Sequence, residues 1–203
     1  AEGHPIGSSL RYKAIGIYSE SDMADSNVPK RPGTMAGDIK IWDANGDGEI
    51  NSLDRIRQDL TDIPQIVYGV NLGITWKQFD LSLLFQGQAK VINTIQETWV
   101  DPSSGGAGNL MQWWTEDMWT PENTDGTKPR LGTPNKINGT TFTNINAAFF
   151  KLKNAEIGYT LPVAVREKIG VANARVYLSG TNLFSFDHMR GMGIDPEATG
   201  SGY

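Results

Sequence analysis

Residues 43–54 place oxygen-bearing side chains at a spacing that suits a calcium ion. Counted from Asp43, oxygen donors stand at loop positions 1, 3, 5, 9 and 12, and Gly48 stands at position 6. Calcium takes about six to eight oxygen ligands, and a glycine at position 6 permits the sharp turn around the ion. The spacing therefore predicts an EF-hand-like calcium loop with six ligands: Asp43, Asn45, Asp47, Glu49, Asn51 and Asp54.

Three positions of this loop indicate what kind of calcium loop it is. Glu49 is expected to contribute its backbone carbonyl, and Ile50 should point away from the ion into an apolar surface. Asp54 ends the loop where sensor loops carry the longer glutamate, which favours a structural metal over a calcium-dependent switch. The alternative is an acidic turn built from the Asn-Gly and Asp-Gly pairs, with no metal.

The composition excludes several kinds of chemistry. The 203 residues carry 18 Lys and Arg against 23 Asp and Glu, so no basic surface for nucleic acid is expected. There is no cysteine, which excludes disulfides and thiolate sites within this stretch. The two histidines, His4 and His188, lie near opposite ends, and no pair of carboxylates suggests an acid and base set. We therefore expect no enzyme and assign no catalytic residue.

Residues 68–86 show the clearest periodicity in the chain. Every second residue from Tyr68 to Trp76 is apolar, and the residues between them are glycines or small polar residues. Lys77 and Gln78 read as a tight turn, after which apolar residues again alternate from Phe79 to Phe85. The pattern predicts a β-hairpin with one apolar face and aromatic residues at both ends of it.

The length of this apolar face matches a membrane. Residues 68–76 span about 26 Å of strand, or roughly 19 Å of height after a 45° tilt, which is close to the apolar band of an outer-membrane barrel. A soluble β-sandwich is the alternative, because its strands also alternate. The aromatic strand ends and the small residues on the opposite face favour the barrel. No apolar run approaches the ~18 residues that a spanning helix requires.

The rest of the chain divides into shorter elements and long loops. Further strands are expected at 10–18, 38–42, 149–161 and 175–186, with a bulge near Lys153 and Asn154, and single helical turns at 55–60 and 165–169. The expected organisation is outer loops over 1–62 with the calcium loop at 43–54, a hairpin over 63–86, an outer loop over 87–148, a hairpin over 149–186 and an outer loop over 187–203. Short links then fall on one side of the sheet and long segments on the other, as in bacterial outer-membrane barrels.

The loop over 87–148 carries the second group of candidate functional residues. Its tryptophans are predicted to stack on a ligand or to contact a protein partner, because aromatic faces suit sugar rings and protein interfaces: Trp99, Trp113, Trp114 and Trp119. Packing of the loop against its own surroundings is an equally good interpretation.

Several short stretches, in order along the chain, resemble SusC/RagA-type TonB-dependent outer-membrane transporters. They are 3–8 (GHPIGS), 37–40 (GDIK), 43–48 (DANGDG), 68–73 (YGVNLG), 79–82 (FDLS), 85–87 (FQG), 119–123 (WTPEN), 152–154 (LKN), 158–162 (GYTLP) and 176–184 (VYLSGTNLF). The resemblance implies an all-β fold in which antiparallel strands form the C-terminal part of a roughly 22-stranded transmembrane β-barrel. It also implies a plug domain and TonB box upstream of these residues, and a last strand beyond Tyr203.

The same resemblance implies the function. Such transporters of the bacterial outer membrane import glycans or peptides together with a SusD-like surface lipoprotein, using energy relayed by TonB. The expected contacts of the whole protein are therefore this lipoprotein, TonB through upstream residues, the nutrient and outer-membrane lipid. The alternative is a secreted, calcium-stabilised interaction module of dockerin or carbohydrate-binding type. A dockerin needs a second loop, and the only related stretch, 123–126, lacks the first aspartate.

Overall fold

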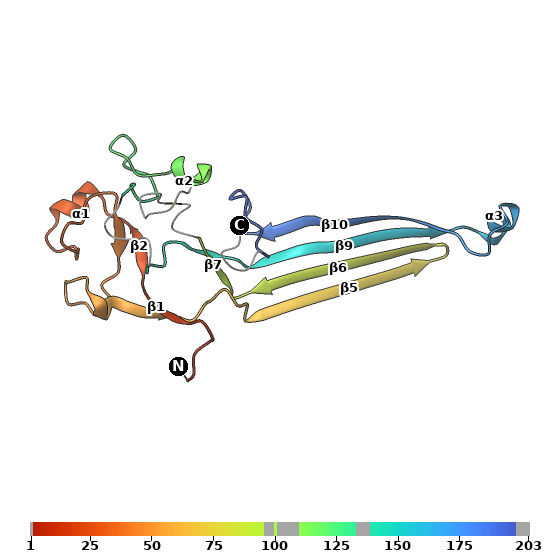
Figure 1. The fold of residues 1–203 in the computed structure, drawn as a ribbon, viewed down its shortest axis with the longest axis horizontal. Coiled ribbons are helices and arrows are strands. Elements are labelled where there is room, and N and C mark those ends of the chain that lie inside the picture. Colours follow the sequence, from red (N-terminus) through yellow and green to blue (C-terminus); the bar gives the residue numbers. More distant parts are fainter. Residues whose placement is uncertain (1, 96–99, 101–109, 133–138, 198–203) are drawn as a thin grey trace.

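The fold was analysed in a computed structural model that describes residues 2–95, 100, 110–132 and 139–197. Its largest element is a four-stranded antiparallel sheet in the order β10-β9-β6-β5 (Figure 1). The strands are β5 (Ile66–Trp76), β6 (Phe79–Ala89), β9 (Phe149–Thr160) and β10 (Arg175–Asp187). β5 and β6 pair antiparallel, as the alternating pattern predicted.

The links at one end of this sheet are short. β5 and β6 are joined through Lys77, whose φ of 55° supplies the left-handed conformation that a tight hairpin needs. β9 and β10 are joined through the short helix α3 (Val163–Lys168), which agrees with the helical turn predicted near this position. Both links lie at the same end of the sheet (Figure 1).

The opposite end carries three small two-stranded ribbons and the remaining helices. The elements are β1 (Ser9–Tyr12) with β4 (Arg55–Gln58), β2 (Ala14–Ile17) with β3 (Ile39–Ile41), β7 (Ile92–Thr94) with β8 (Asn144–Asn146), α1 (Glu20–Ala24), the 3₁₀ turn η1 (Ser52–Asp54) and α2 (Gln112–Thr115). These elements gather beyond the loop end of the long strands (Figure 1).

Two sequence predictions in this region are wrong. Residues 55–60 do not form a helical turn, because β4 pairs antiparallel with β1, placing Ile56 opposite Arg11. The single strand expected over 10–18 is two strands, since β1 and β2 pair with different partners.

The bulge predicted in β9 is present. Leu84 of β6 pairs with Asn154, whereas the next residue, Phe85, pairs with Leu152. Lys153 is therefore an extra residue that no residue of β6 opposes. β10 has its own irregularity between Thr181 and Phe184. Such bulges locally redirect side chains in a sheet.

Most buried apolar residues lie in the loop region, and Phe149 and Leu152 at the loop end of β9 are buried as well. One apolar cluster joins Ile39 of β3 to Trp114 of α2, together with Ile95 and Val100. In contrast, every residue of β5 is exposed. The folded chain therefore leaves a large apolar sheet surface without a covering layer. Among the described residues, no helix is both long and apolar enough to cross a membrane.

Candidate functional site

The four-stranded sheet has one apolar face. Residues paired directly across antiparallel strands share a face, so the pairing register assigns each strand's side chains. Leu72 pairs with Leu83, which pairs in turn with Ala155, and Ile74 pairs with Leu81. The face continues across the sheet through Val70, Phe85, Leu152, Ile157, Val176, Leu178 and Phe184.

Aromatic rings mark both ends of this apolar face. At the end near the turn, the Phe79 and Tyr159 ring centroids are 4.7 Å apart, and the Lys77 ammonium lies 4.8 Å from the Trp76 ring. At the loop end, aromatic residues contact one another through Tyr68, Phe85, Phe150, Phe184 and Phe186. Amphipathic aromatic rings are enriched at both membrane–water interfaces.

The opposite face is polar and carries two ion clusters. Near the turn end, Arg175 of β10 donates to Asp80 of β6, with Nε 3.1 Å from Oδ1, and to Glu156 of β9 at 2.6 Å. These three residues come from three adjacent strands. The cluster therefore ties the strands together on the face opposite the apolar one.

The second ion cluster lies at the loop end of the same polar face. Lys151 Nζ lies 2.6 Å from Asp195 and 3.1 Å from Glu197, and Lys153 Nζ lies 2.6 Å from Glu197. The side chain of Lys151 is only 6% exposed. Sequence reasoning missed this cluster, because the lysines and acids are 44 residues or more apart. The slip in alternation near Lys153 was the only local signal.

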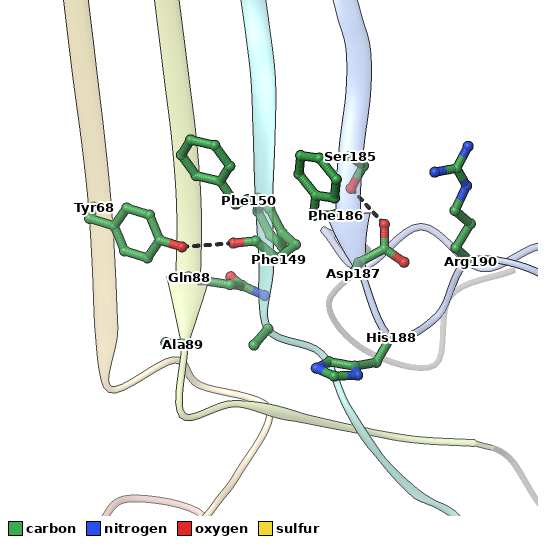
Figure 2. A pocket seen from close by; sticks show the side chains of 11 residues that line it. Tyr68, Gln88, Ala89, Phe149, Phe150, Ser185, Phe186, Asp187, His188 and Arg190 are labelled. Atoms are coloured by element: carbon green, nitrogen blue, oxygen red, sulfur yellow. Dashed lines mark hydrogen bonds between the residues drawn. The ribbon is translucent and has the colours of Figure 1, made fainter.

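A hollow of about 440 Å³ opens where the long strands meet the loops (Figure 2). The Tyr68 hydroxyl donates to the Phe149 carbonyl at 3.1 Å, and its ring lies across Gly87 of β6. Phe150 and Phe186 add further aromatic lining, and His188 and Arg190 follow at the end of β10 (Figure 2). The hollow thus joins an aromatic surface to a polar rim.

Residues 43–54 form a compact loop organised by its own side chains. The two carboxylate oxygens of Asp43 accept the backbone N–H groups of Gly46 (2.7 Å) and Gly48 (2.8 Å). The Asp47 carboxylate accepts the N–H of Glu49 at 2.9 Å, and this bond is the main cause that lowers the pKa of Asp47. The chain therefore curls around the first half of the loop.

The second half of the loop is fixed by Asp54. This residue is fully buried, and its two oxygens accept the N–H groups of Ala44 (2.9 Å) and Asn51 (2.7 Å). Ile50 is 7% exposed, the inward orientation expected of loop position 8. Across the described residues, however, no three His, Cys, Asp or Glu side chains are gathered as a metal cluster would require. Calcium binding by this loop stays a prediction.

The tryptophans predicted to contact a ligand or partner differ in their surroundings. Trp99 lies outside the described residues. Trp114 is 2% exposed and packs against Trp113 and Phe142, and Trp119 lies against Gly37. Trp114 is thus buried by local packing, and contact of the four tryptophans, Trp99 included, with a ligand or partner stays a prediction.

No protein-family profile matches the chain. Two proteins of Formosa agariphila are similar along nearly its whole length. TonB-dependent receptor P3 is 33% identical, covering 97% of this chain and 19% of the receptor, and TonB-dependent receptor P26 is 28% identical, covering 99% and 20%.

Solved transporter structures are also similar to this chain. The RagAB peptide transporter matches with a TM-score of 0.64 and 25% identity, covering 95% of this chain and 20% of its own. The RagAB peptide importer in its closed-closed state matches with a TM-score of 0.62 and 25% identity, covering 94% and 20%.

These relatives define a class of receptors and transporters, and none of those named is an enzyme. The chain belongs to the TonB-dependent receptor family, and the RagAB structures confirm the SusC/RagA-type resemblance. It spans about a fifth of the length of the relatives that it matches.

Proposed function

We propose that these residues form part of the barrel and outer loops of a TonB-dependent transporter in the bacterial outer membrane. The observation that carries this proposal is the two-faced sheet. An exposed apolar face with aromatic ends suits lipid hydrocarbon, and a face with Asp80, Glu156 and Arg175 suits a water-filled interior. These residues perform no bond chemistry on this account.

The cargo is a peptide or a glycan, taken up together with a SusD-like surface lipoprotein and energised through TonB. Support for a peptide comes from the RagAB relatives, which are described as a peptide transporter and a peptide importer. The loop region at one end of the sheet is the surface that a capping lipoprotein would meet. Trp99, Trp113 and Trp119 are the aromatic candidates for such contacts, since Trp114 is buried.

Calcium is the second element of the proposal. The ion would be held by Asp43, Asn45, Asp47, the Glu49 carbonyl, Asn51 and Asp54, and it would supply structural stability, with no part in transport chemistry. The curled backbone around Asp43 and the inward Ile50 support it. Millimolar calcium outside the cell would keep even a weak site filled.

The membrane placement is tested by adjacent substitutions on opposite faces of β5. Leu72 lies on the apolar face and Asn71 on the polar face. An arginine near the bilayer midplane costs about 2–4 kcal/mol, whereas an arginine facing the interior meets water. In the full-length receptor, Leu72→Arg should strongly reduce the amount of heat-modifiable, protease-resistant barrel in the outer membrane. Asn71→Arg should leave it close to wild type.

Equal assembly of the two variants, or a larger defect in Asn71→Arg, would contradict the proposed placement. The pair controls for the introduced charge, because both variants gain one arginine in the same strand.

A further inference from the structure

In the ion cluster at the loop end of the polar face, the cations come from one strand and the anions from one short segment. Both cations, Lys151 and Lys153, come from the bulged strand β9, and both anions come from the segment that follows β10. Asp195 and Glu197 belong to a three-residue stretch, Asp-Pro-Glu, which we term the acidic segment (residues 195–197). A short acidic peptide of this chain therefore sits on a pair of lysines.

The two lysines lie at the bulge of β9 and contact the same acid. Lys151 pairs with Gln86 of β6 and Ser185 of β10, whereas Lys153 is opposed by no residue in either register. Both ammonium groups lie close to Glu197, with Nζ to carboxylate-oxygen distances of 3.1 Å for Lys151 and 2.6 Å for Lys153.

The acidic segment is bound through both of its carboxylates and one backbone carbonyl, the same groups that a separate peptide could offer. Its two carboxylates meet the lysines, and its backbone carbonyl at Pro196 accepts from Gln88 Nε2 at 3.3 Å. Burial would raise the pKa of the Asp195 and Glu197 carboxyls, but hydrogen bonds from the lysines outweigh it, so both pKa values are lowered. Both groups are thus anionic at neutral pH.

The chain before the acidic segment is anchored by two apolar residues, with two glycines between them. Met189 is fully buried against Val91 and Ala147. Gly191 and Gly193 follow, with φ of 102° and 71°, in a region of conformational space that glycine enters without strain. Ile194, which directly precedes the acidic segment, packs against the same cluster, and Pro196 within the segment is buried. Displacement of the acidic segment must therefore release Ile194 and Pro196 as well as the lysines, while Met189 can stay in place.

Removing the anions from the lysines would destabilise the folded protein. Lys151 is nearly buried, and an uncompensated buried charge is strongly destabilising. A departing acidic segment must therefore be replaced by another anion. The groups present suit a peptide with two carboxylates two residues apart, because that is the ligand they already bind.

We propose that Lys151 and Lys153 form a binding site for acidic peptides, which the chain's own acidic segment occupies in this structure. The site lies on the polar face of the sheet, and its place on a transport path rests on the proposed function. An incoming acidic peptide competes with the acidic segment for the lysines and for Gln88.

The test measures binding to the purified full-length receptor in detergent, so it does not depend on transport. The probes are fluorescently labelled Gly-Asp-Pro-Glu-Gly and its neutral analogue Gly-Asn-Pro-Gln-Gly, followed by fluorescence anisotropy at low salt. Asp195→Asn with Glu197→Gln removes the competitor and keeps the lysines. This variant should bind the acidic probe roughly tenfold more tightly, and the neutral probe as the wild type does.

The reciprocal variant removes the cations. Lys151→Gln with Lys153→Gln should lower affinity for the acidic probe by about tenfold or more and leave the neutral probe unaffected. Its control, Lys77→Gln with Lys168→Gln, makes the same change in net charge at the turn end of the sheet. That control should bind the acidic probe as the wild type does.

A permanent structural ion cluster gives a different result. The acid-to-amide variant would then bind the acidic probe no better than the wild type, and the proposal would be overturned even if the lysine variant failed to fold. An equal gain in Glu122→Gln with Asp125→Asn, two exposed loop residues, would also overturn it, because net charge alone would explain the effect. Tighter binding of an unsaturated tetra-uronate than of the acidic probe would overturn the assignment to peptides.

Discussion

Tyr68 shows how one residue closes the loop end of the sheet. Its ring crosses Gly87 on β6, and its hydroxyl reaches the Phe149 carbonyl on β9 at 3.1 Å. A side chain at Gly87 would place its Cβ 2.4 Å from the Tyr68 hydroxyl and 2.5 Å from the Phe149 oxygen. The absence of a side chain at this position is therefore what allows the tyrosine to span three strands.

We predict that Gly87→Ala destabilises the receptor by about 1–3 kcal/mol, since the clash involves a backbone oxygen that cannot move freely. Tyr68→Phe should lose about 1 kcal/mol with its hydrogen bond. The measurement is the urea concentration at which the full-length barrel loses its heat-modifiable form. Gly73→Ala is the matched control, because a Cβ there meets nothing within 4 Å. Equal effects at Gly87 and Gly73 would show that Tyr68 does not depend on the glycine.

The second prediction at this scale concerns the calcium loop. Trp42 directly precedes Asp43, so terbium bound in place of calcium should give luminescence on tryptophan excitation. We expect a saturable signal that calcium displaces with an apparent Kd of roughly 10⁻⁴–10⁻³ M. Asp47→Asn should weaken it severalfold, and Trp42→Phe should lower the signal without changing the affinity for calcium. If terbium gives no saturable signal, residues 43–54 are an acidic turn held by its own hydrogen bonds.

Residue-scale features were predictable where they depend on local spacing. The inward Ile50 and the aromatic strand ends follow from position and alternation alone. The contacts of Tyr68 and Lys151 do not, because they depend on strand pairing and on acids far away in the sequence. The burial of Trp114 likewise depends on β3, which lies far from it in the chain.

At the scale of elements, α1 illustrates how a short helix is fixed in place. Ser19 and Asp22 form a capping box, and Asp22 also pairs with Lys40 of β3 at 2.7 Å. The hydrogen bond from Lys40 is the main cause that lowers the pKa of Asp22, and the Ser19 backbone N–H contributes next. A single carboxylate thus caps the helix and binds it to β3.

We predict a matching pH dependence for the packing of α1. A carboxyl with a lowered folded-state pKa contributes stability above its ordinary pKa of 3.8, and this stability is lost as the pH falls through the lower folded value. The protection of residues 19–25 against hydrogen exchange, corrected for the pH dependence of the intrinsic exchange rate, should therefore stay constant from neutral pH down to about 4. It should fall only below that pH. Asp22→Asn should accelerate exchange already at neutral pH, whereas exposed Glu20→Gln should not. Neutral-pH exchange unchanged by Asp22→Asn would contradict this role.

The elements also show where sequence patterns stop being informative. β5 and β6 were predictable because eleven-residue strands repeat the alternation many times. The segment 55–58 is too short for the spacing of its apolar residues to distinguish a helix from a strand. Pairing with β1 decides it, and pairing of this kind joins segments far apart in the chain. The bulge at Lys153 was visible because it breaks an otherwise regular pattern.

At the scale of the whole molecule, the chain separates into a long sheet and a loop region beyond one end of it (Figure 1). The sheet is exposed along all of β5, and the loop region has its own buried cluster. A sheet with an uncovered apolar face is unfavourable in water and favourable in lipid. The family relationship and the two-faced sheet thus lead to the same account. On the proposed account, the long strands face hydrocarbon on one side, and the ion clusters face the barrel interior on the other.

The most direct test of this account is spin-label accessibility along β5. Single cysteines are introduced at each position from 68 to 76 in a cysteine-free full-length receptor, labelled with nitroxide and reconstituted in lipid bilayers. The account predicts a period of two. Oxygen accessibility should peak at positions 68, 70, 72, 74 and 76, and accessibility to a water-soluble nickel chelate should peak at 69, 71, 73 and 75. Uniform accessibility to the nickel chelate along the strand, or the reversed phase, would contradict the placement of this face in the membrane.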